Sequence, residues 1–502
     1  MSAYILAHDL GTSGNKAVLY DESGKLIASV LRGYNVSHPA PGFVEQNPED
    51  WWNAVCGATK ELLARTEIST ADIACCCFSG QMMGCLPVDK NGEPLYPSII
   101  WADMRAVKQA EKMQNLIGME NAYRITGHRI GASYSASKLL WLRDNRPDIF
   151  ARTYKMLQAK DYIIYRLTGA FVTDYSDAGG TNLFDLNQKC WSEPILRELG
   201  ITSSMLPDIH ASTGIAGKVS AAAASATGLL EGTPVVIGGG DGSCACVGAG
   251  VVDQGKTYNV IGSSSWISMA AREPLYDPAM RTFNWVHLDC ELYTPCGTMQ
   301  SAGYSVKWAR DVLCAPETGY DLISAQAAAS TPGAGGLLFL PHLMGERSPY
   351  WNPNARGCFI GMTVNTAKCD MLRAVFEGVG YALKAILDIL ENSAEIPEIT
   401  VIGGGAQDSL WMQILADIWQ KKLMIPQELE EATSMGAACC GGVGIGLFDD
   451  FRAVSRFLNS GSEVLPCPEN AVLYERLYAL WERCYKALDD AGIYTGLSTL
   501  NG

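Results

Sequence analysis

The sequence contains no apolar run that could span a membrane and no basic N-terminal segment of the kind that opens a secretion signal. One uncharged stretch, residues 432–448, is slightly short and too rich in glycine for a spanning helix. The apolar start of the chain is interrupted by Asp9, so it does not read as a signal peptide. We therefore expect a cytoplasmic protein without a membrane partner.

Metal-ligand patterns are also missing. The chain has only six histidines, no H-E-x-x-H sequence and no C-x-x-C pairs at zinc-finger spacing. Its 17 cysteines include three in a row, Cys75 to Cys77, and adjacent residues on a strand point to opposite faces of a sheet. These absences argue against a structural zinc site and indicate a reduced interior.

Positive charge is scarce. The 38 basic residues are outnumbered by 53 acidic ones, which gives a formal net charge of −15 and argues against a nucleic-acid partner. An anionic nucleotide would have to be held by local backbone amides and a metal instead of a basic surface. The length of 502 residues and the hydrophobic content of 48% suit two large α/β domains.

The opening of the chain predicts a strand, a tight polar turn and a returning strand over residues 4–20. Thr12 and Ser13 supply hydroxyl donors in the turn, and Lys16 supplies a cation. Asp9, at the end of the first strand, is placed to hold a Mg²⁺ that bridges nucleotide phosphates. An ordinary glycine-rich hairpin would show the same pattern, so this stretch alone does not decide between the two.

The second half of the chain repeats this opening. Residues 258–261 predict a strand, Gly262 to Ser265 a second turn rich in hydroxyls, and residues 266–270 a return strand. Two such hairpins that face each other across a cleft would hold a triphosphate from both sides. Farther on, the predicted strand 399–402 ends in a glycine-rich turn at residues 403–408, where a flat base and a ribose could lie against the backbone.

Polar residues at other strand ends suggest a substrate site. The strand 73–78 leads into residues 79–84, and the strand 235–237 leads into a glycine-flanked Asp241. Asp103 and Arg105 could both hydrogen-bond to two vicinal hydroxyls of a sugar, although a surface ion pair would have the same spacing. We also expect helices over residues 48–65, 136–144 and 161–167 and a polar turn at residues 174–177.

Two nucleotide patterns in this region lack their structural context. Residues 240–245 fit G-x-G-x-x-A, but no acidic residue follows in residues 260–264, where one would bind a ribose. Residues 250–257 fit the P-loop pattern, but a predicted strand follows where a P-loop needs a helix. A nucleotide-dependent oxidoreductase is therefore disfavoured.

Six motifs in order resemble the FGGY family of carbohydrate kinases and, within it, the xylulokinases. The resemblance covers nearly the whole chain. The motifs are the phosphate sequences Asp9–Ser13 and Gly262–Ser264, the N-terminal signature Lys138–Leu142, the xylulokinase sequence Gly345–Pro349, the C-terminal signature from Gly357–Met362 through Leu372–Gly378, and the adenosine sequence Gly403–Ala406.

This resemblance implies an α/β, two-domain, actin-like ATPase fold (ribonuclease H-like) with the active site in the interdomain cleft. We expect an N-terminal domain over residues 1–248 and a C-terminal domain over residues 249–502. The implied activity is transfer of the γ-phosphoryl group of ATP to a ketose, with a pentulose such as xylulose as acceptor. Alternatives are a ribulose, gluconate or erythritol kinase, or an actin-fold ATPase without a sugar substrate.

The expected reactants are ATP with Mg²⁺ and a small sugar, and homodimerisation is left open. The resemblance assigns Asp241 as the catalytic base, with Asp9 and Asp241 as metal ligands. The expected nucleotide contacts are Gly11, Thr12, Ser13, Asn15, Lys16, Gly262, Ser263, Ser264, Gly403, Gly404, Gly405, Ala406 and Gln407. The expected substrate contacts are Gln81, Met82, Met83, Asp103, Arg105, Asp241 and Gly242.

The sequence departs from the xylulokinase pattern in the expected sugar pocket. Met83 replaces the usual histidine of Gln-Met-His-Gly, Gly242 replaces the asparagine after the catalytic aspartate, and Ala102-Asp103-Met104-Arg105 replaces Asn-Asp-Gly-Arg. Methionine and glycine cannot supply the side-chain hydrogen bonds of histidine and asparagine. The sequence therefore predicts a preference for a ketose or polyol other than D-xylulose, or poor use of D-xylulose. The alternative is an ordinary xylulokinase in which neighbouring side chains or water replace both contacts.

Overall fold

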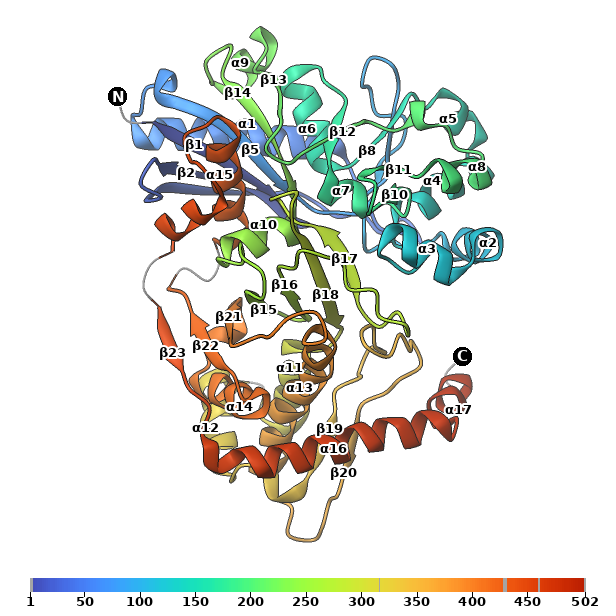
Figure 1. Ribbon diagram of the computed structural model, residues 1–502, viewed down its shortest axis with the longest axis vertical. Helices are drawn as coiled ribbons and strands as arrows, with labels where there is room; N and C mark the ends of the chain where they lie inside the picture. The colour runs from blue at the N-terminus through green and yellow to red at the C-terminus, as the bar shows by residue number, and fades with distance from the viewer. Residues whose placement is uncertain (1–2, 316, 428–430, 459–460, 501–502) are drawn as a thin grey trace.

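The protein is described here by a computed structural model of residues 3–315, 317–427, 431–458 and 461–500. It has two lobes, each built around one mixed β-sheet (Figure 1). The strands of the first lobe, in spatial order, are β13 (Ile215–Lys218), β14 (Pro234–Gly240), β5 (Ile73–Gly80), β1 (Tyr4–Leu10), β2 (Gly14–Asp21) and β3 (Leu26–Gly33).

The sheet of the second lobe has the same core arrangement. Its strands, in spatial order, are β17 (Phe283–Val286), β18 (Tyr293–Met299), β16 (Ser265–Met269), β15 (Thr257–Ile261), β21 (Glu398–Ile402), β22 (Lys422–Ile425) and β23 (Ser462–Val464). In each lobe the opening strand, β1 or β15, pairs antiparallel with the next strand and parallel with a later one. The predicted duplication of the hairpin is confirmed.

Alternation of side chains along the central strands gives each sheet two buried faces. In β1, Leu6 and Leu10 pack toward α1 (Pro48–Thr66), whereas Ile5 and Ala7 belong to the core on the opposite face. Helix α1 begins as predicted, with the side chain of Asn47 accepting a hydrogen bond from the N–H of Glu49. The three adjacent cysteines follow the same alternation, because Cys76 lies in the α1 core while its two neighbours lie in the other.

The remaining helices surround the sheets. In the first lobe they are α2 (Val107–Ile117), α3 (Met119–Thr126), α4 (Ser135–Asn145), α5 (Pro147–Arg152), α6 (Ala159–Thr168), α7 (Tyr175–Gly179), α8 (Glu193–Leu199) and α9 (Ala221–Thr227). In the second lobe they are α11 (Gly303–Leu313), α12 (Tyr320–Ala328), α13 (Lys368–Leu390), α14 (Ser409–Trp419), α16 (Pro468–Asp490) and α17 (Ile493–Leu500). None of the helices in the described ranges has the length and apolar character needed to cross a bilayer.

Within the described part of the chain, short strands form five additional two-stranded pairs. They are β4 (Glu45–Gln46) with β7 (Ser98–Ile99), β6 (Leu86–Val88) with β8 (Lys155–Leu157), β9 (Val172–Asp174) with β12 (Asp208–His210), β10 (Phe184–Asp185) with β11 (Cys190–Trp191), and β19 (Leu338–Leu340) with β20 (Cys358–Ile360). The polar turn predicted at residues 174–177 is wrong. The carboxylate of Asp174 accepts hydrogen bonds from the N–H groups of Ser176 and Asp177 and so caps helix α7.

Two helices join the lobes. Helix α10 (Asp241–Gly248) follows the last central strand of the first lobe, and α15 (Ala432–Gly444) follows β22 of the second lobe but packs on β1, β5 and β14 of the first (Figure 1). The two helices touch backbone to backbone. A Cβ atom on Gly436 would lie 1.9 Å from the carbonyl oxygen of Cys244, and one on Gly248 would lie 1.7 Å from that of Ala432.

This close contact predicts that Gly436→Ala destabilises the protein. Because the obstructing atoms belong to backbone, the helices must separate, and we expect a loss of about 3 kcal/mol or more in the free energy of unfolding. Gly496→Ala is the matched control, since a Cβ atom there meets nothing within 4 Å in helix α17. Chemical denaturation measures both, and equal stabilities of the two variants would contradict the prediction.

Candidate active site

The carboxyl ends of three neighbouring strands gather the predicted catalytic residues of the first lobe. In the parallel pairing, Asp9 of β1 lies opposite Ser79 of β5, and Gly239 and Gly240 of β14 lie opposite Ser79 and Gly80. Asp241 follows directly and starts helix α10. The structure thus brings Asp9 and Asp241 together at one sheet edge, although they are distant in the sequence.

Asp241 has the electrostatic surroundings of a base that works near neutral pH. Burial raises the pKa of its carboxyl to about 7, and the negative charge of Asp9 adds to this effect. The N–H of Gly242 donates a hydrogen bond to its Oδ1 at 2.7 Å and partly offsets the increase. A carboxylate with such a pKa can accept a proton from a hydroxyl far better than an exposed one.

Asp9 has a similar environment and an additional charged pair beside it. Burial raises the pKa of Asp9 to about 6, whereas a hydrogen bond from Ser79 Oγ and the charge of Lys16 lower it. Lys16 forms an ion pair of 3.1 Å with Glu431, which precedes α15, so this contact joins the two lobes. Two adjacent carboxylates of raised pKa suit a divalent cation.

A metal at this position needs ligands beyond the protein. Among the described residues no group of three or more His, Cys, Asp or Glu side chains is arranged to hold an ion. The two carboxylates fit Mg²⁺, which is commonly held by one or two carboxylates together with substrate phosphates and water.

The turn of the first hairpin is shaped by side chains that bond to its carbonyls. The N–H of Gly11 donates to the carbonyl of Gly14, and the carbonyl of Thr12 accepts from Gln46 Nε2 at 2.6 Å. Ser13 is exposed. Asn15 is fully buried instead, and its Oδ1 lies 3.2 Å from Nδ1 of His8, so its side chain points away from the turn.

The predicted nucleotide residues of the second lobe also meet at one sheet edge. Gly262, Ser263 and Ser264 form an exposed turn between β15 and β16. Because Val260 pairs with Ile402 of β21, the turn at residues 403–407 comes next to this hairpin. A Cβ atom on Gly403, whose φ is +90°, would lie 2.7 Å from the carbonyl oxygen of Ile261. The turn therefore requires glycine at this position; Gly404, Gly405, Ala406 and Gln407 complete it.

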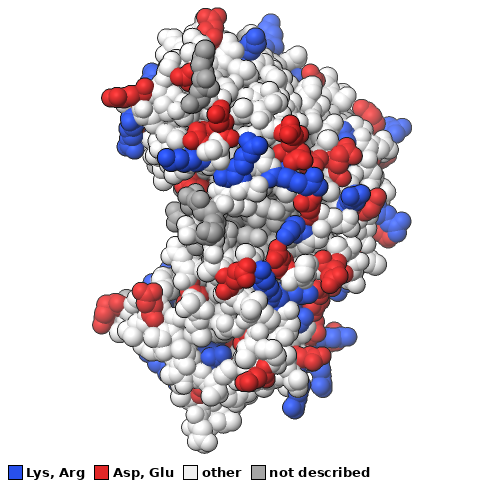
Figure 2. Space-filling model, turned by 60° about the vertical axis from the view of Figure 1, so that its left-hand side comes forward, with Lys and Arg blue, Asp and Glu red and all other residues white. Residues whose placement is uncertain are grey.

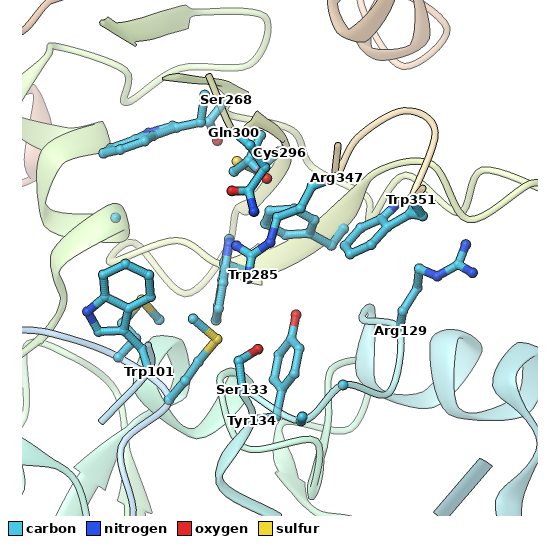
Figure 3. Close-up of a pocket in the computed structure, with 18 of the residues that line it drawn as sticks. Trp101, Arg129, Ser133, Tyr134, Ser268, Trp285, Cys296, Gln300, Arg347 and Trp351 are labelled. Atoms are coloured by element: carbon cyan, nitrogen blue, oxygen red, sulfur yellow. The ribbon is translucent and has the colours of Figure 1, made fainter. Parts of the chain in front are cut away.

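A pocket of about 450 Å³ opens beside Asp241 and takes residues from both lobes (Figure 3). Of the predicted substrate contacts, Met82, Met83, Asp241 and Gly242 line it. Tryptophans dominate its other walls: Trp101 from the first lobe and Trp266, Trp285 and Trp351 from the second. The molecule narrows between the lobes, and acidic and basic side chains are interspersed over the face shown in Figure 2.

Three predicted substrate contacts lie outside this pocket. Gln81 is buried and donates from Nε2 to the carbonyl of Gly11 and to Gln46 Oε1. Asp103 and Arg105 are paired at 2.7 Å with fully buried side chains. Arg105 also pairs with Glu45 at 2.7 Å. Asp103 and Arg105 anchor the loop that follows β7, and Trp101 and Met104 of the same loop line the pocket.

A buried lysine connects two pocket-lining segments, at Met83 and Ser133, through hydrogen bonds. Lys138, from the predicted N-terminal signature, donates from Nζ to the carbonyl of Met83 at 2.8 Å and to that of Ser133 at 2.6 Å. Burial lowers the pKa of this ammonium group to about 7. Met83 has a φ of +62°, which is unusual for a side chain larger than glycine. The lysine therefore stabilises the backbone conformation that presents Met83 to the pocket.

Sequence reasoning missed most of the pocket. The residues not predicted include Trp101, Met104, Arg129, Tyr134, Trp266, Trp285, Glu346, Arg347 and Trp351. Met104 lies between the predicted residues Asp103 and Arg105, so a period-two pattern could have found it. Trp101 shares the parity of that pair, so the same pattern could not have found it. Arg347 lies inside the recognised Gly345–Pro349 sequence. The other aromatic residues come from isolated positions with no local signal.

In comparisons with known proteins, both lobes match domains of the same protein family. Residues 4–248 match the N-terminal domain of the FGGY family of carbohydrate kinases, and residues 257–445 match its C-terminal domain. The chain is 32% identical over 485 residues to a xylulose kinase of Staphylococcus xylosus, covering 96% of this chain and 100% of that one. It is 31% identical over 501 residues to a gluconokinase of Bacillus subtilis, covering 98% and 97%.

A solved structure resembles the whole chain. The crystal structure of ligand-bound xylulose kinase from Lactobacillus acidophilus has a TM-score of 0.93 and 30% identity, covering 99% of this chain and 100% of that one. This agreement over both lobes confirms the predicted two-domain, actin-like ATPase fold.

The raised pKa of Asp241 predicts a pH-dependent gain in stability when its carboxyl is removed. Between pH 4 and 7 the folded protein binds a proton at Asp241 that the unfolded chain, with a pKa near 3.8, has released. The folded form is therefore disfavoured as the pH rises through this range. Because Asp241 keeps some contact with solvent, we expect Asp241→Asn to stabilise by about 1–2 kcal/mol more at pH 8 than at pH 5.

Urea denaturation at both pH values measures this difference. Asp253→Asn is the control, because it removes an exposed carboxylate from a surface ion pair with Arg452 and should change stability by less than about 0.5 kcal/mol at either pH. A gain for Asp241→Asn that is the same at pH 5 and pH 8 would mean that Asp241 is not held in an unfavourable ionised state.

Proposed function

Because the chain belongs to the FGGY family of carbohydrate kinases, we propose that it transfers the γ-phosphoryl group of ATP to a hydroxyl of a ketose of the pentulose class, of which xylulose is the reference member. The observation that carries this proposal is the position of Asp241. Its carboxyl borders the pocket, and its charge interacts with Asp9 of the first hairpin. The carbonyl of the next residue, Gly242, accepts a hydrogen bond from the hydroxyl of Tyr258 in β15, the first strand of the second hairpin.

In this proposal Asp241 acts as the general base. A sugar hydroxyl in the pocket donates its proton to the carboxylate while its oxygen attacks the γ-phosphorus, and the bond to the β-phosphate oxygen breaks to release ADP. The turns at Gly11–Ser13 and Gly262–Ser264 would hold the phosphates through N–H groups and hydroxyls. The turn at residues 403–407 would hold the adenosine.

We infer that the nucleotide binds with Mg²⁺, held by Asp9 and Asp241. Bound there, the ion would neutralise negative charge on the phosphates. A cytoplasmic location is supported by the cysteines, all 17 of which are free thiols. The domain boundary at residues 248 and 249 and a homodimeric assembly remain predictions.

The pocket supports a ketose or polyol that differs from D-xylulose. Met83 lines it with a thioether where xylulokinases usually have histidine, and a Cβ atom on Gly242 would meet nothing within 4 Å. The space beside Asp241 is therefore open, and two hydrogen-bonding side chains are missing. Each lost hydrogen bond to a substrate hydroxyl costs on the order of 1–3 kcal/mol in a buried site.

One observation favours a sugar acid as second candidate. Arg347 points into the pocket (Figure 3), and among the described residues its guanidinium has no hydrogen-bond or ion-pair partner. Arg129 also lines the pocket, and its guanidinium carbon lies 5.1 Å from the ring centroid of Trp351. A guanidinium binds a carboxylate with two parallel hydrogen bonds. The similarity to a gluconokinase is consistent with such an acceptor.

Removal of the base tests the reaction. We expect Asp241→Asn to lower kcat by roughly 10²–10⁴, the usual contribution of a positioned base, with little change in nucleotide affinity in the absence of metal. Release of ADP in a coupled assay gives kcat, and calorimetry gives the affinity. The control Asp253→Asn should retain wild-type kcat, and an Asp241→Asn enzyme of near-normal kcat would exclude Asp241 from this role.

A substrate panel tests the acceptor. We expect wild type to prefer another ketose or polyol to D-xylulose, and Met83→His with Gly242→Asn to raise kcat/KM for D-xylulose more than tenfold. Arg347→Gln should leave kcat/KM for neutral sugars within about threefold and reduce it for gluconate more than tenfold if gluconate is used. The assay compares D-xylulose, D-ribulose, erythritol and gluconate.

Each result has a distinct meaning. A wild type that favours D-xylulose, with no gain in the double variant, would contradict the altered pocket. Activity on gluconate alone would support the sugar-acid candidate over the ketose. Hydrolysis of ATP that no acceptor stimulates would support an actin-fold ATPase without a sugar substrate.

A further inference from the structure

The carbonyl groups of the first phosphate turn, at residues 11–13, all accept hydrogen bonds from neighbouring residues. The carbonyl of Gly11 accepts hydrogen bonds from the hydroxyl of Tyr34 and from Gln81 Nε2, and that of Thr12 accepts from Gln46 Nε2. The carbonyl of Ser13 accepts from the N–H of Tyr34. The backbone of the turn is therefore fixed, but the Thr12 hydroxyl can still rotate about its Cα–Cβ and Cβ–Oγ bonds.

Trp101 connects this hydroxyl to the sugar pocket. It follows β7, and its ring lines the pocket with 38% of its surface exposed. In Figure 3 the indole nitrogen faces away from the centre of the pocket. This nitrogen donates a hydrogen bond of 2.9 Å to Thr12 Oγ1, so a single ring contacts the pocket with its face and the phosphate turn with its edge.

The direction of this hydrogen bond determines what Thr12 can do. An indole N–H is only a donor, whereas a hydroxyl has one proton and two lone pairs. When Thr12 Oγ1 accepts from Trp101, its own proton cannot point toward the indole and remains available for another acceptor. In a nucleotide site that acceptor is a phosphate oxygen, which binds a hydroxyl proton through a charge-assisted hydrogen bond.

The loop that carries Trp101 is rigid enough for this task. Two residues beyond it, Asp103 accepts a hydrogen bond of 2.5 Å from the N–H of Val44 and pairs with Arg105, and both charged side chains are fully buried. Arg105 also lies 3.9 Å from the ring centroid of Phe43. These buried contacts fix the backbone from which the indole reaches Thr12.

We propose that Trp101 is a positioning residue of the nucleotide site: its indole N–H orients the Thr12 hydroxyl as a donor to nucleotide phosphate. The inference rests on the proposed function, because it requires a nucleotide phosphate at the first hairpin. It also assigns to a residue of the sugar pocket a role that does not depend on which sugar binds there.

Calorimetric titration with MgADP, without any sugar, tests this role. Trp101→Phe keeps an aromatic ring but lacks the N–H, and we expect it to weaken MgADP binding about fivefold. Trp285→Phe is the matched control, because it makes the same change in the same pocket at a residue with no described hydrogen bond to the turn, and it should bind MgADP within twofold of wild type. Adenosine affinity should stay within twofold in both variants, because it has no phosphate.

Thr12 variants complete the experiment. Thr12→Val should weaken MgADP binding about tenfold and Thr12→Ser less than threefold, and adding Trp101→Phe to Thr12→Val should cause no further loss, because the hydroxyl to be oriented is gone. Wild-type MgADP affinity in Trp101→Phe or in Thr12→Val would overturn the inference but not the proposed function. Additive losses of MgADP affinity in the double variant would do the same. A wild-type protein that does not bind MgADP would overturn the proposed function and the inference with it.

Discussion

The contact between α10 and α15 is the constraint on which the arrangement of the lobes depends. Gly248 and Gly436 allow carbonyl oxygens of the opposite helix to approach closer than any side chain would permit. Asp241 is the first residue of α10, so the same contact positions its carboxyl between the two sheets. Small buried residues fill the surrounding core, including Cys77, Cys244 and Cys440, because larger side chains would separate the helices.

A buried charge cluster supports the strand that leads to Asp241. Lys160 pairs with Asp161 at 2.7 Å, Asp174 at 3.1 Å and Asp177 at 3.2 Å. Burial raises the pKa of Asp177 well above its usual value, and the charge of Lys160 opposes this increase. Asp174 also accepts from Ser176 Oγ, which in turn accepts from the N–H of Gly240. This chain of hydrogen bonds fixes the end of β14 next to the candidate base.

The sequence was informative where function requires a local backbone pattern. Both hairpins, the glycine turn after β21 and the strand before Asp241 could be predicted, because glycine, hydroxyl and carboxylate residues follow apolar strands there. The pocket walls could not, since Trp285 and Trp351 reach the site only through the packing of the second lobe. The spacing of Asp103 and Arg105 could not decide between a ligand contact and an ion pair, because two opposite charges at a strand end fit both roles.

The placement of α15 has a consequence for the order of folding. This helix completes the core of the first lobe but is encoded about two hundred residues after β14, as its position shows. At the usual synthesis rate of about 5–20 residues per second, α15 is synthesised roughly 10–40 s after β14, and the apolar face that it covers on the first sheet is exposed during this time. The first lobe therefore exposes apolar surface during translation. Its core is completed only after α15, near the end of the chain, has been synthesised.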